Sequence, residues 1–291
     1  MTLPYFDYVA AKSLKEASEL VSGRPGKCLL MAGGTDIICG LKDNVIKGIE
    51  TIVDLKTIPD LVKLEYDEAG GLKIGAGVKL YQIHSSPMVR EKLPAVAEAA
   101  HYVASLQIRR KATLVGNICN ASPSADTAGI LLAMGAKVKT WTPSGGRTID
   151  IDNFFTGVKK TCLEKGEIVT EVIVPSLKSG EGSAYFKHAV RKAMDLAIIG
   201  VAAWVRLDGR RVVDCRMALG GVATTPMRAR EAEKVLIGQE PTEEILEKAG
   251  LAASKECKPI SDVRASADYR ADMIRVFTKR AVAKAVESLK A

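Results

Sequence analysis

The sequence predicts an α+β fold, in which a larger domain of mixed strands and helices precedes a smaller domain with an antiparallel sheet and helices. Two observations predict the smaller domain. Residues 198–207 and 211–219 read as strands that flank Asp208 and Gly209, a pair typical of a tight hairpin because both turn positions tolerate positive φ. Beyond residue 226 the chain reads as helical. Consecutive strands followed by consecutive helices are typical of an α+β domain.

The larger domain begins with a clearly signalled helix. Ser13 and Glu16 form a capping box, and an apolar stripe runs from Leu14 to Val21 until Pro25 ends the helix. After it we expect strands at residues 27–31, 51–55, 72–78 and 137–142, and helices at residues 93–105 and 126–134.

A change in composition near Pro175 predicts the domain boundary. Residues 177–182 are polar and contain Gly and Ser, as linkers often do. We therefore divide the chain into domains at residues 1–176 and 177–291. In the second domain we expect a strand at residues 184–190 before the hairpin, and helices at residues 227–236, 242–253 and 265–289.

The composition excludes several classes of protein. Hydrophobic residues make up 47% and charged residues 26%, which is typical of a globular protein. Aromatic residues, at 5%, are too sparse for a base-stacking nucleic-acid surface, although the net charge is +8. No apolar run approaches the ~18 residues of a membrane helix. Residues 1–10 do not resemble a signal peptide, so we expect a cytoplasmic protein that binds no nucleic acid and spans no membrane.

The cysteines and the basic residues bear on metal sites and on possible partners. None of the six cysteines forms a C-x-x-C pair, so we expect neither an iron–sulfur cluster nor a zinc site on this chain. The dispersed positive charge is either a solvated surface or a surface that meets an acidic subunit or an anionic cofactor.

The most informative segment follows the strand at residues 27–31. An apolar strand runs into two glycines, whose backbone can take positive φ and lets a ligand approach closely. Successive N–H groups in such a turn form an anion-binding nest that suits a pyrophosphate. The alternative is a plain strand-to-helix turn with an Asp cap. The segment consists of Leu29, Leu30, Met31, Ala32, Gly33, Gly34, Thr35 and Asp36.

A second segment, residues 107–126, is rich in small and hydrogen-bonding residues with apolar flanks. Buried polar groups need partners, and a polar ligand would supply them. The alternative is a loop that caps the helix beginning at Asp126. Together with the first segment it predicts a site for a phosphate-bearing, hydroxyl-rich cofactor. The residues chosen are Thr113, Leu114, Val115, Gly116, Asn117 and Asp126.

These strings resemble the FAD-binding medium subunits of the molybdenum hydroxylases, the xanthine dehydrogenase and carbon monoxide dehydrogenase family. The two segments are similar to the family's two FAD loops, and the run from Pro259 to Arg270 is similar to its C-terminal domain. The resemblance covers nearly the whole chain. It implies a two-part FAD-binding domain of the PCMH/vanillyl-alcohol-oxidase type, followed by the smaller α+β domain.

The resemblance also implies roles for individual residues. The first segment would wrap the pyrophosphate, and residues 113–117 would hold the phosphates and ribityl chain. Asp126 would accept a hydrogen bond from a flavin hydroxyl, unless it only caps its helix. Lys187 would approach the flavin ring, where a positive charge favours the anionic reduced form, unless it is only a solvated strand residue. Val169 would pack on the ring. At Val115 the family has glycine, and we expect extended backbone there because β-branched residues disfavour positive φ.

By the same resemblance, the chain is an oxidoreductase subunit that binds FAD non-covalently. Electrons would come from [2Fe–2S] clusters on a small subunit, after substrate reacts at a molybdenum cofactor on a large subunit, in a dimer of heterotrimers. The substrate and the final acceptor, whether NAD, quinone, ferredoxin or oxygen, stay open. The alternatives are a stand-alone flavin oxidoreductase and an assembly subunit that has lost its flavin.

Overall fold

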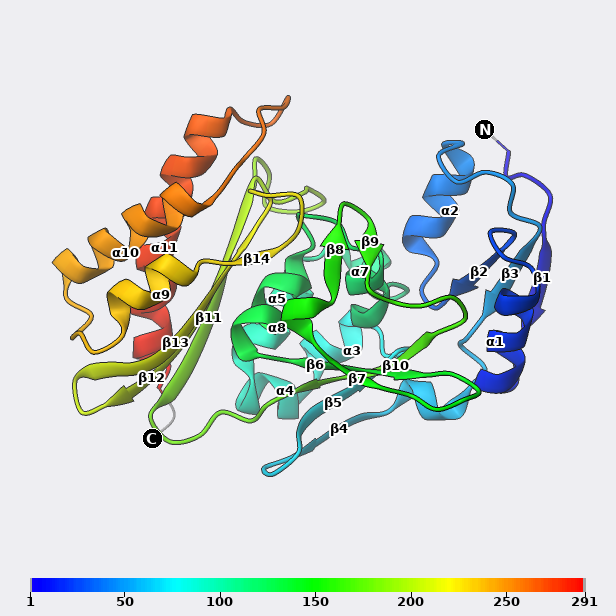
Figure 1. Cartoon of the computed structure of the whole chain (residues 1–291), viewed down its shortest axis with the longest axis horizontal. Helices are drawn as coiled ribbons and strands as arrows, with labels where there is room; N and C mark the ends of the chain where they lie inside the picture. Colours follow the sequence, from blue (N-terminus) through cyan, green and yellow to red (C-terminus); the bar gives the residue numbers. More distant parts are fainter. Residues whose placement is uncertain (1, 290–291) are drawn as a thin grey trace.

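The computed structural model describes residues 2–289, which form three parts in a row along the longest axis of the molecule (Figure 1). Each part contains a β-sheet and helices that pack on it. The expected α+β class is confirmed, with mixed secondary structure in the first two parts and strands before helices in the third.

The N-terminal part is a parallel sheet of three strands in the order β1-β3-β2. All four residues of its central strand are buried, as expected in a parallel sheet. The predicted cap of the first helix is present, since the Ser13 Oγ accepts from the Glu16 amide at 3.2 Å. The elements are β1 (Asp7–Ala10), α1 (Leu14–Gly23), β2 (Cys28–Met31), α2 (Thr35–Lys42) and β3 (Thr51–Asp54).

The middle part is an antiparallel sheet of five strands in the order β4-β5-β10-β6-β7, with helices on it. Its strands are β4 (Leu64–Asp67), β5 (Gly71–Gly75), β6 (Lys137–Trp141), β7 (Thr148–Asp150) and β10 (Ile168–Val174). Its helices are α3 (Leu80–Ser85), α4 (Pro87–Lys92), α5 (Pro94–Tyr102), α6 (Leu106–Arg109), α7 (Leu114–Cys119) and α8 (Asp126–Met134). Minor elements are the 3₁₀ turns η1 (Pro59–Val62) and η2 (Ile151–Asn153), and the strand pair β8 (Phe155–Gly157) and β9 (Lys160–Thr161).

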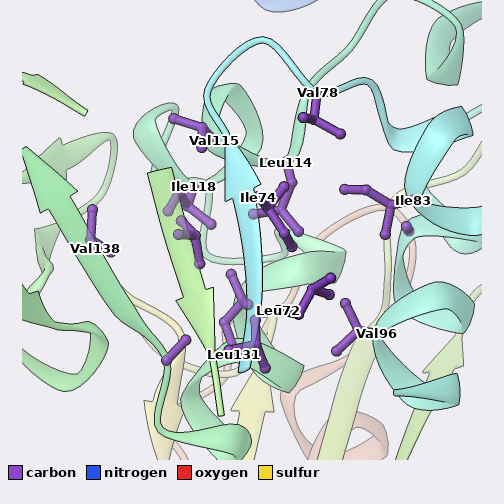
Figure 2. Packing of buried hydrophobic residues seen from close by; sticks show 14 of the residues in the cluster. Leu72, Ile74, Val78, Ile83, Val96, Leu114, Val115, Ile118, Leu131 and Val138 are labelled. Carbon is purple, nitrogen blue, oxygen red and sulfur yellow. The ribbon is translucent and has the colours of Figure 1, made fainter. Parts of the chain in front are cut away.

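The main hydrophobic core lies between this sheet and its helices. Figure 2 shows Leu72 and Ile74 of β5 in one cluster with Leu114 and Ile118 of α7 and Leu131 of α8. All five side chains are fully buried. The core therefore fixes the position of α7, whose other face lines the cavity described below.

The central strand β10 was not predicted from the sequence. It pairs with β5 on one side and with β6 on the other. A register shift between Val169 and Glu171 breaks the alternation of buried and exposed residues that identifies a half-buried strand. Val169 and Val172 are consequently both buried, although they are three positions apart, an odd spacing that in a regular strand places side chains on opposite faces.

The C-terminal part is an antiparallel sheet of four strands, followed by helices. The predicted hairpin is confirmed, because Asp208 pairs with Arg211 and Gly209 has φ +57°. The elements are β11 (Glu181–His188), β12 (Ile199–Asp208), β13 (Arg211–Gly220), β14 (Met227–Arg228), α9 (Arg230–Leu236), α10 (Glu243–Glu256) and α11 (Ala267–Glu287).

The sheet of the C-terminal part is buried on both faces. Successive side chains of a strand point to opposite faces. Ala202 and Ala218 accordingly belong to the main core of the middle part, whereas Val201 and Ala203 belong to a second core beneath α9–α11. Helix α8 packs on the first face and α11 on the second. The sheet is thus shared between the middle and C-terminal parts.

The structure corrects three expectations about local conformation. Val115 is helical rather than extended, because Thr113 caps α7 and carries residues 114–119 into a helix. Residues 227–228 form the edge strand β14, and the predicted helix begins only at Arg230. The predicted linker at residues 177–182 ends inside a strand, since β11 begins at Glu181.

An ion pair with a buried carboxylate joins the residue before β7, Arg147, to the residue before β10, Glu167. The Glu167 side chain is only 2% exposed, and its two oxygens accept from the Arg147 Nε and Nη2 at 2.7 and 2.8 Å. The hydrogen bonds from Arg147 lower the pKa of the Glu167 carboxyl to about 2. Because the pKa of Glu167 is lower in the folded chain than its ordinary value of 4.5, the ionised carboxylate stabilises the fold at a pH above 4.5. This contribution is lost as the pH falls toward about 2.

We expect Glu167→Gln to lower the free energy of unfolding by about 1–3 kcal/mol near neutral pH, because the amide cannot accept two charged hydrogen bonds. The difference from wild type should shrink below about pH 4. Urea denaturation at about pH 7 and about pH 3 measures both effects. Glu164→Gln is the control, since that side chain is 76% exposed and lies 3.9 Å from the Arg147 Nη1. Equal losses in the two variants, or a loss that does not depend on pH, would contradict the prediction.

Candidate cofactor site

A cavity of about 570 Å³ lies where the three parts of the molecule meet. Its lining comes from residues 32–37 at the start of α2, residues 103–108 before and within α6, residues 112–126 around α7, and residues 194–196 between β11 and β12. Segments that are far apart in the sequence therefore enclose one space, to which every part of the chain contributes.

The first wall is the glycine turn that joins β2 to α2. A Cβ on Gly33 would lie 2.5 Å from the Lys111 carbonyl oxygen and 2.7 Å from the Ala112 Cα, so the two backbones touch. Gly34 is the N-cap of α2 and has φ +74°, a conformation that disfavours side chains. The first N–H groups of a helix lack intrahelical acceptors. The residues at the start of α2 line the cavity, where these donors suit an anion.

Asp36 connects the first wall to the second. Its Oδ1 accepts from the Asn120 Nδ2 at 2.9 Å, and both residues line the cavity. A carboxylate repels phosphate, so this hydrogen bond gives Asp36 a role in joining α2 to the end of α7.

The second wall is the cap and exposed face of α7. The Thr113 Oγ1 accepts from the Gly116 amide at 2.9 Å and starts the helix. Asn117 lines the cavity, and its Oδ1 accepts from the Thr127 Oγ1 at 2.6 Å. Leu114 and Val115 are buried in the core on the other side of α7. The helix thus presents small and polar residues to the cavity.

The floor contains a buried ion pair. The Lys187 Nζ lies 2.9 Å from the Asp126 Oδ2, and it also donates to the carbonyl oxygens of Tyr102 at 3.0 Å and Asp195 at 2.8 Å. The Tyr185 hydroxyl donates to the Asp126 Oδ1 at 3.1 Å. Burial raises the pKa of the Asp126 carboxyl, and Lys187 opposes that rise. The three N–H groups of the Lys187 ammonium are thus all engaged, and Lys187 holds Asp126 in place from outside the cavity.

The structure brings most of the predicted site residues to the cavity and places the others behind its walls. Those that line it are Leu30, Ala32, Gly33, Gly34, Thr35, Asp36, Thr113, Gly116, Asn117 and Asp126. Those that do not are Leu29, Met31, Leu114, Val115, Val169 and Lys187. Val169 pairs with Thr140 within the middle sheet and belongs to the main core. Lys187 reaches the site only through Asp126 and Asp195.

Sequence reasoning missed the wall that contains Ala104 and Met194. Both residues have positive φ, 44° and 56°, which their residue types do not indicate. The Met194 amide donates to the Ala104 carbonyl at 3.3 Å, so the two segments hold each other in place. Strained backbone at a cavity often marks a functional site. The only available sequence signal was the Arg191 and Asp195 pattern nearby, which does not reveal this contact.

Two family models match the chain. The FAD binding domain in molybdopterin dehydrogenase matches residues 4–177, and the CO dehydrogenase flavoprotein C-terminal domain matches residues 184–285. The putative xanthine dehydrogenase FAD-binding subunit of Escherichia coli (strain K12) is 35% identical over 283 residues, which cover 97% of this chain and 96% of that protein. The carbon monoxide dehydrogenase medium chain of Hydrogenophaga pseudoflava is 35% identical over 282 residues, 97% of each chain.

The chain belongs to the FAD-binding subunits of the molybdenum hydroxylases. The expected family is confirmed, and with it the assignment as an oxidoreductase subunit with FAD as its cofactor. The solved structure of carbon monoxide dehydrogenase from Hydrogenophaga pseudoflava superposes with a TM-score of 0.95 at 34% identity over the full length of both chains. The two-part FAD-binding fold with a C-terminal domain is therefore confirmed.

The cavity of this flavoprotein subunit fits the cofactor of its family. Gly33 lets the turn after β2 pack directly on the backbone of residues 111–112, and the polar lining suits a ligand with phosphates and hydroxyls. Among residues 2–289 no helix is long and apolar enough to cross a membrane. Over the same residues no cluster of His, Cys, Asp or Glu could hold a metal ion.

We expect Gly34→Val to abolish FAD binding while the chain still folds. The new Cβ would lie 2.7 Å from the Met31 Sδ, and a side chain at φ +74° costs about 1–3 kcal/mol, so the turn must move. Visible absorbance measures the FAD bound per chain, and circular dichroism measures the fold.

Gly48→Val is the matched control for that experiment. Gly48 has φ +70°, but a Cβ there meets no atom within 4 Å. It should carry the same backbone strain and keep its FAD. Stoichiometric FAD in Gly34→Val, or equal loss in both variants, would show that the turn does not hold the cofactor.

Proposed function

We propose that this chain is the electron-transfer subunit of a molybdenum hydroxylase complex, with its FAD in the cavity between the three parts. The observation that carries the proposal is the convergence of both predicted FAD segments on this one cavity. The complex would pass electrons from [2Fe–2S] clusters on a small subunit through FAD to an external acceptor. Substrate would react at the molybdenum cofactor of a large subunit.

Different residues around the cavity would bind different parts of the FAD. The backbone of residues 32–35 and the start of α7 would bind the phosphates, with Thr113, Gly116 and Asn117 on the second side. Leu29 and Met31 would support the first turn from behind, and Leu114 and Val115 would support the second. Asp126 is held by Lys187 and Tyr185, so its carboxylate is in a fixed position to accept from a flavin hydroxyl. Val169 would support the site only through the core.

Bound FAD would supply the ability to take up single electrons from the clusters and to release them singly or in pairs to an acceptor. The residues of this chain would hold the cofactor, shield it from water and set its potential. The three acids of residues 2–289 that line the cavity are already engaged, since Asp126 pairs with Lys187, Asp195 pairs with Arg191, and Asp36 accepts from Asn120. A stand-alone oxidoreductase needs an acid or base free to act on substrate, so these pairings favour the electron-transfer role.

The same comparisons support a proposal for the division of the chain and of the complex. We propose an FAD-binding domain at residues 1–176 and a C-terminal domain at residues 177–291, as the matched ranges 4–177 and 184–285 support. Relatives named for xanthine and for carbon monoxide both match this chain, so the chain itself does not identify the substrate. The substrate would react on the large subunit. We also propose a dimer of heterotrimers.

We expect the FAD to be bound without a covalent link. Cys119 is the cysteine that lines the cavity, and burial raises the pKa of its thiol to about 12, which keeps it protonated and unreactive. No histidine of the described chain lines the cavity. Acid precipitation should therefore release all flavin into the supernatant. Flavin that remains in the washed pellet would contradict this expectation.

We expect the native complex to contain iron and molybdenum and the isolated chain to contain neither. Tagged protein purified from its source cells should bring down one large and one small subunit, and metal analysis of both preparations gives the comparison. The isolated, FAD-loaded chain should not hydroxylate substrate. Hydroxylation by the metal-free chain alone would overturn the proposed function and favour a stand-alone enzyme.

A further inference from the structure

The guanidinium of Arg109 is buried without a carboxylate partner in the described part of the chain. The residue is only 9% exposed, and its Nη1 donates to the carbonyl oxygens of Val103 at 2.9 Å and Ala104 at 3.3 Å. Its Nε is buried and has no hydrogen-bond partner among residues 2–289. Burying a charge without a partner is strongly destabilising, which is why buried charges in proteins are usually paired. Such a group requires an explanation other than stability.

Arg109 lies directly behind one wall of the cavity. Both of its acceptor residues, Val103 and Ala104, line that wall. The Ala104 carbonyl also accepts from the Met194 amide, so the guanidinium contacts the point where two lining segments meet. The guanidinium therefore contacts the backbone of two residues that line the cavity.

Both carboxylates that line the cavity beside this wall pair with other cations, so neither offsets Arg109. Lys187 lies 2.9 Å from Asp126, and Arg191 lies 3.5 Å from Asp195. Burial and the nearby arginines lower the pKa of His101, which leaves its ring neutral near pH 7. Burial, His101 and Arg90 do the same for His84. Arg109 therefore leaves this wall with a net positive charge, which a low-dielectric setting screens poorly.

We propose that Arg109 raises the reduction potential of the bound FAD by stabilising its anionic reduced form. This inference rests on the proposed placement of FAD in the cavity, with its phosphates at the first two walls and its flavin ring at this third one. Reduction by two electrons gives the anionic form when one proton is taken up and the neutral form when two are. A fixed positive charge behind the wall favours the anionic form and therefore the uptake of only one proton. Lys187, which was expected to supply this charge, shares its own with Asp126.

The test compares variants of the FAD-loaded chain. Arg109→Gln removes the charge but keeps a donor for the Val103 carbonyl, Arg109→Lys keeps the charge, and Arg110→Gln removes an exposed neighbouring charge. Arg110 stacks on the Tyr81 ring, 4.4 Å from its centroid. The potential is measured by anaerobic titration with dithionite against a reference dye. We expect a lower potential in Arg109→Gln only, and a wild-type potential whose pH dependence corresponds to one proton per two electrons near neutrality.

Each outcome decides for or against the inference. An unchanged potential in Arg109→Gln would overturn it, and so would equal shifts in the Gln and Lys variants, which indicate a purely structural role. If Arg109→Gln fails to fold or to bind FAD, the wild-type pH dependence decides, because uptake of two protons contradicts the inference. Retention of FAD by Gly34→Val would instead sink the proposed site. Loss of FAD there with an unchanged Arg109→Gln potential would sink only the role of Arg109.

Discussion

The close contact between Gly33 and the backbone of residues 111–112 is the constraint on which the cavity depends. Only a residue without a side chain lets the turn after β2 approach the start of α7 this closely. The approach in turn allows Asp36 to reach Asn120, which joins the two walls a second time. At another wall the Met194 amide donates to the Ala104 carbonyl, and Lys187 forms an ion pair with Asp126. These contacts join the three parts of the molecule around one space.

Much of the fold could be predicted because its signals are local. The cap at Ser13, the hairpin turn at Gly209 and the apolar helix Asp126–Met134 each depend on neighbouring residues, and each has its expected place. The strand β10 could not be predicted, since its bulge removes the alternation that identifies a strand. The edge strand β14 is only two residues long and forms because β13 offers it a partner, which the sequence does not show.

The site could be predicted in part for a related reason. Glycines and small polar residues mark the two walls that bind through the backbone, and both walls line the cavity. The third wall uses Ala104 and Met194, whose left-handed conformation comes from contacts between distant segments and not from their residue types. The role of Arg109 was hidden for the same reason. A sequence shows that an arginine is present, but only a structure shows that no carboxylate of residues 2–289 pairs with it.

The shared walls have a consequence for how the protein unfolds. A ligand that binds only the assembled cavity stabilises every part that contributes to it, because opening any one of them releases the ligand. The sheet of β11–β13 already couples the middle and C-terminal parts through two cores. One face of the small parallel sheet at the N-terminus joins the main core through Val53 and through Ala17 of α1, but the part of the sheet that packs on α2 has only a minor core, centred on Met31, Leu41 and Ile52. Cofactor would therefore matter most for that part, which makes it the natural place for local opening and proteolysis of the cofactor-free chain.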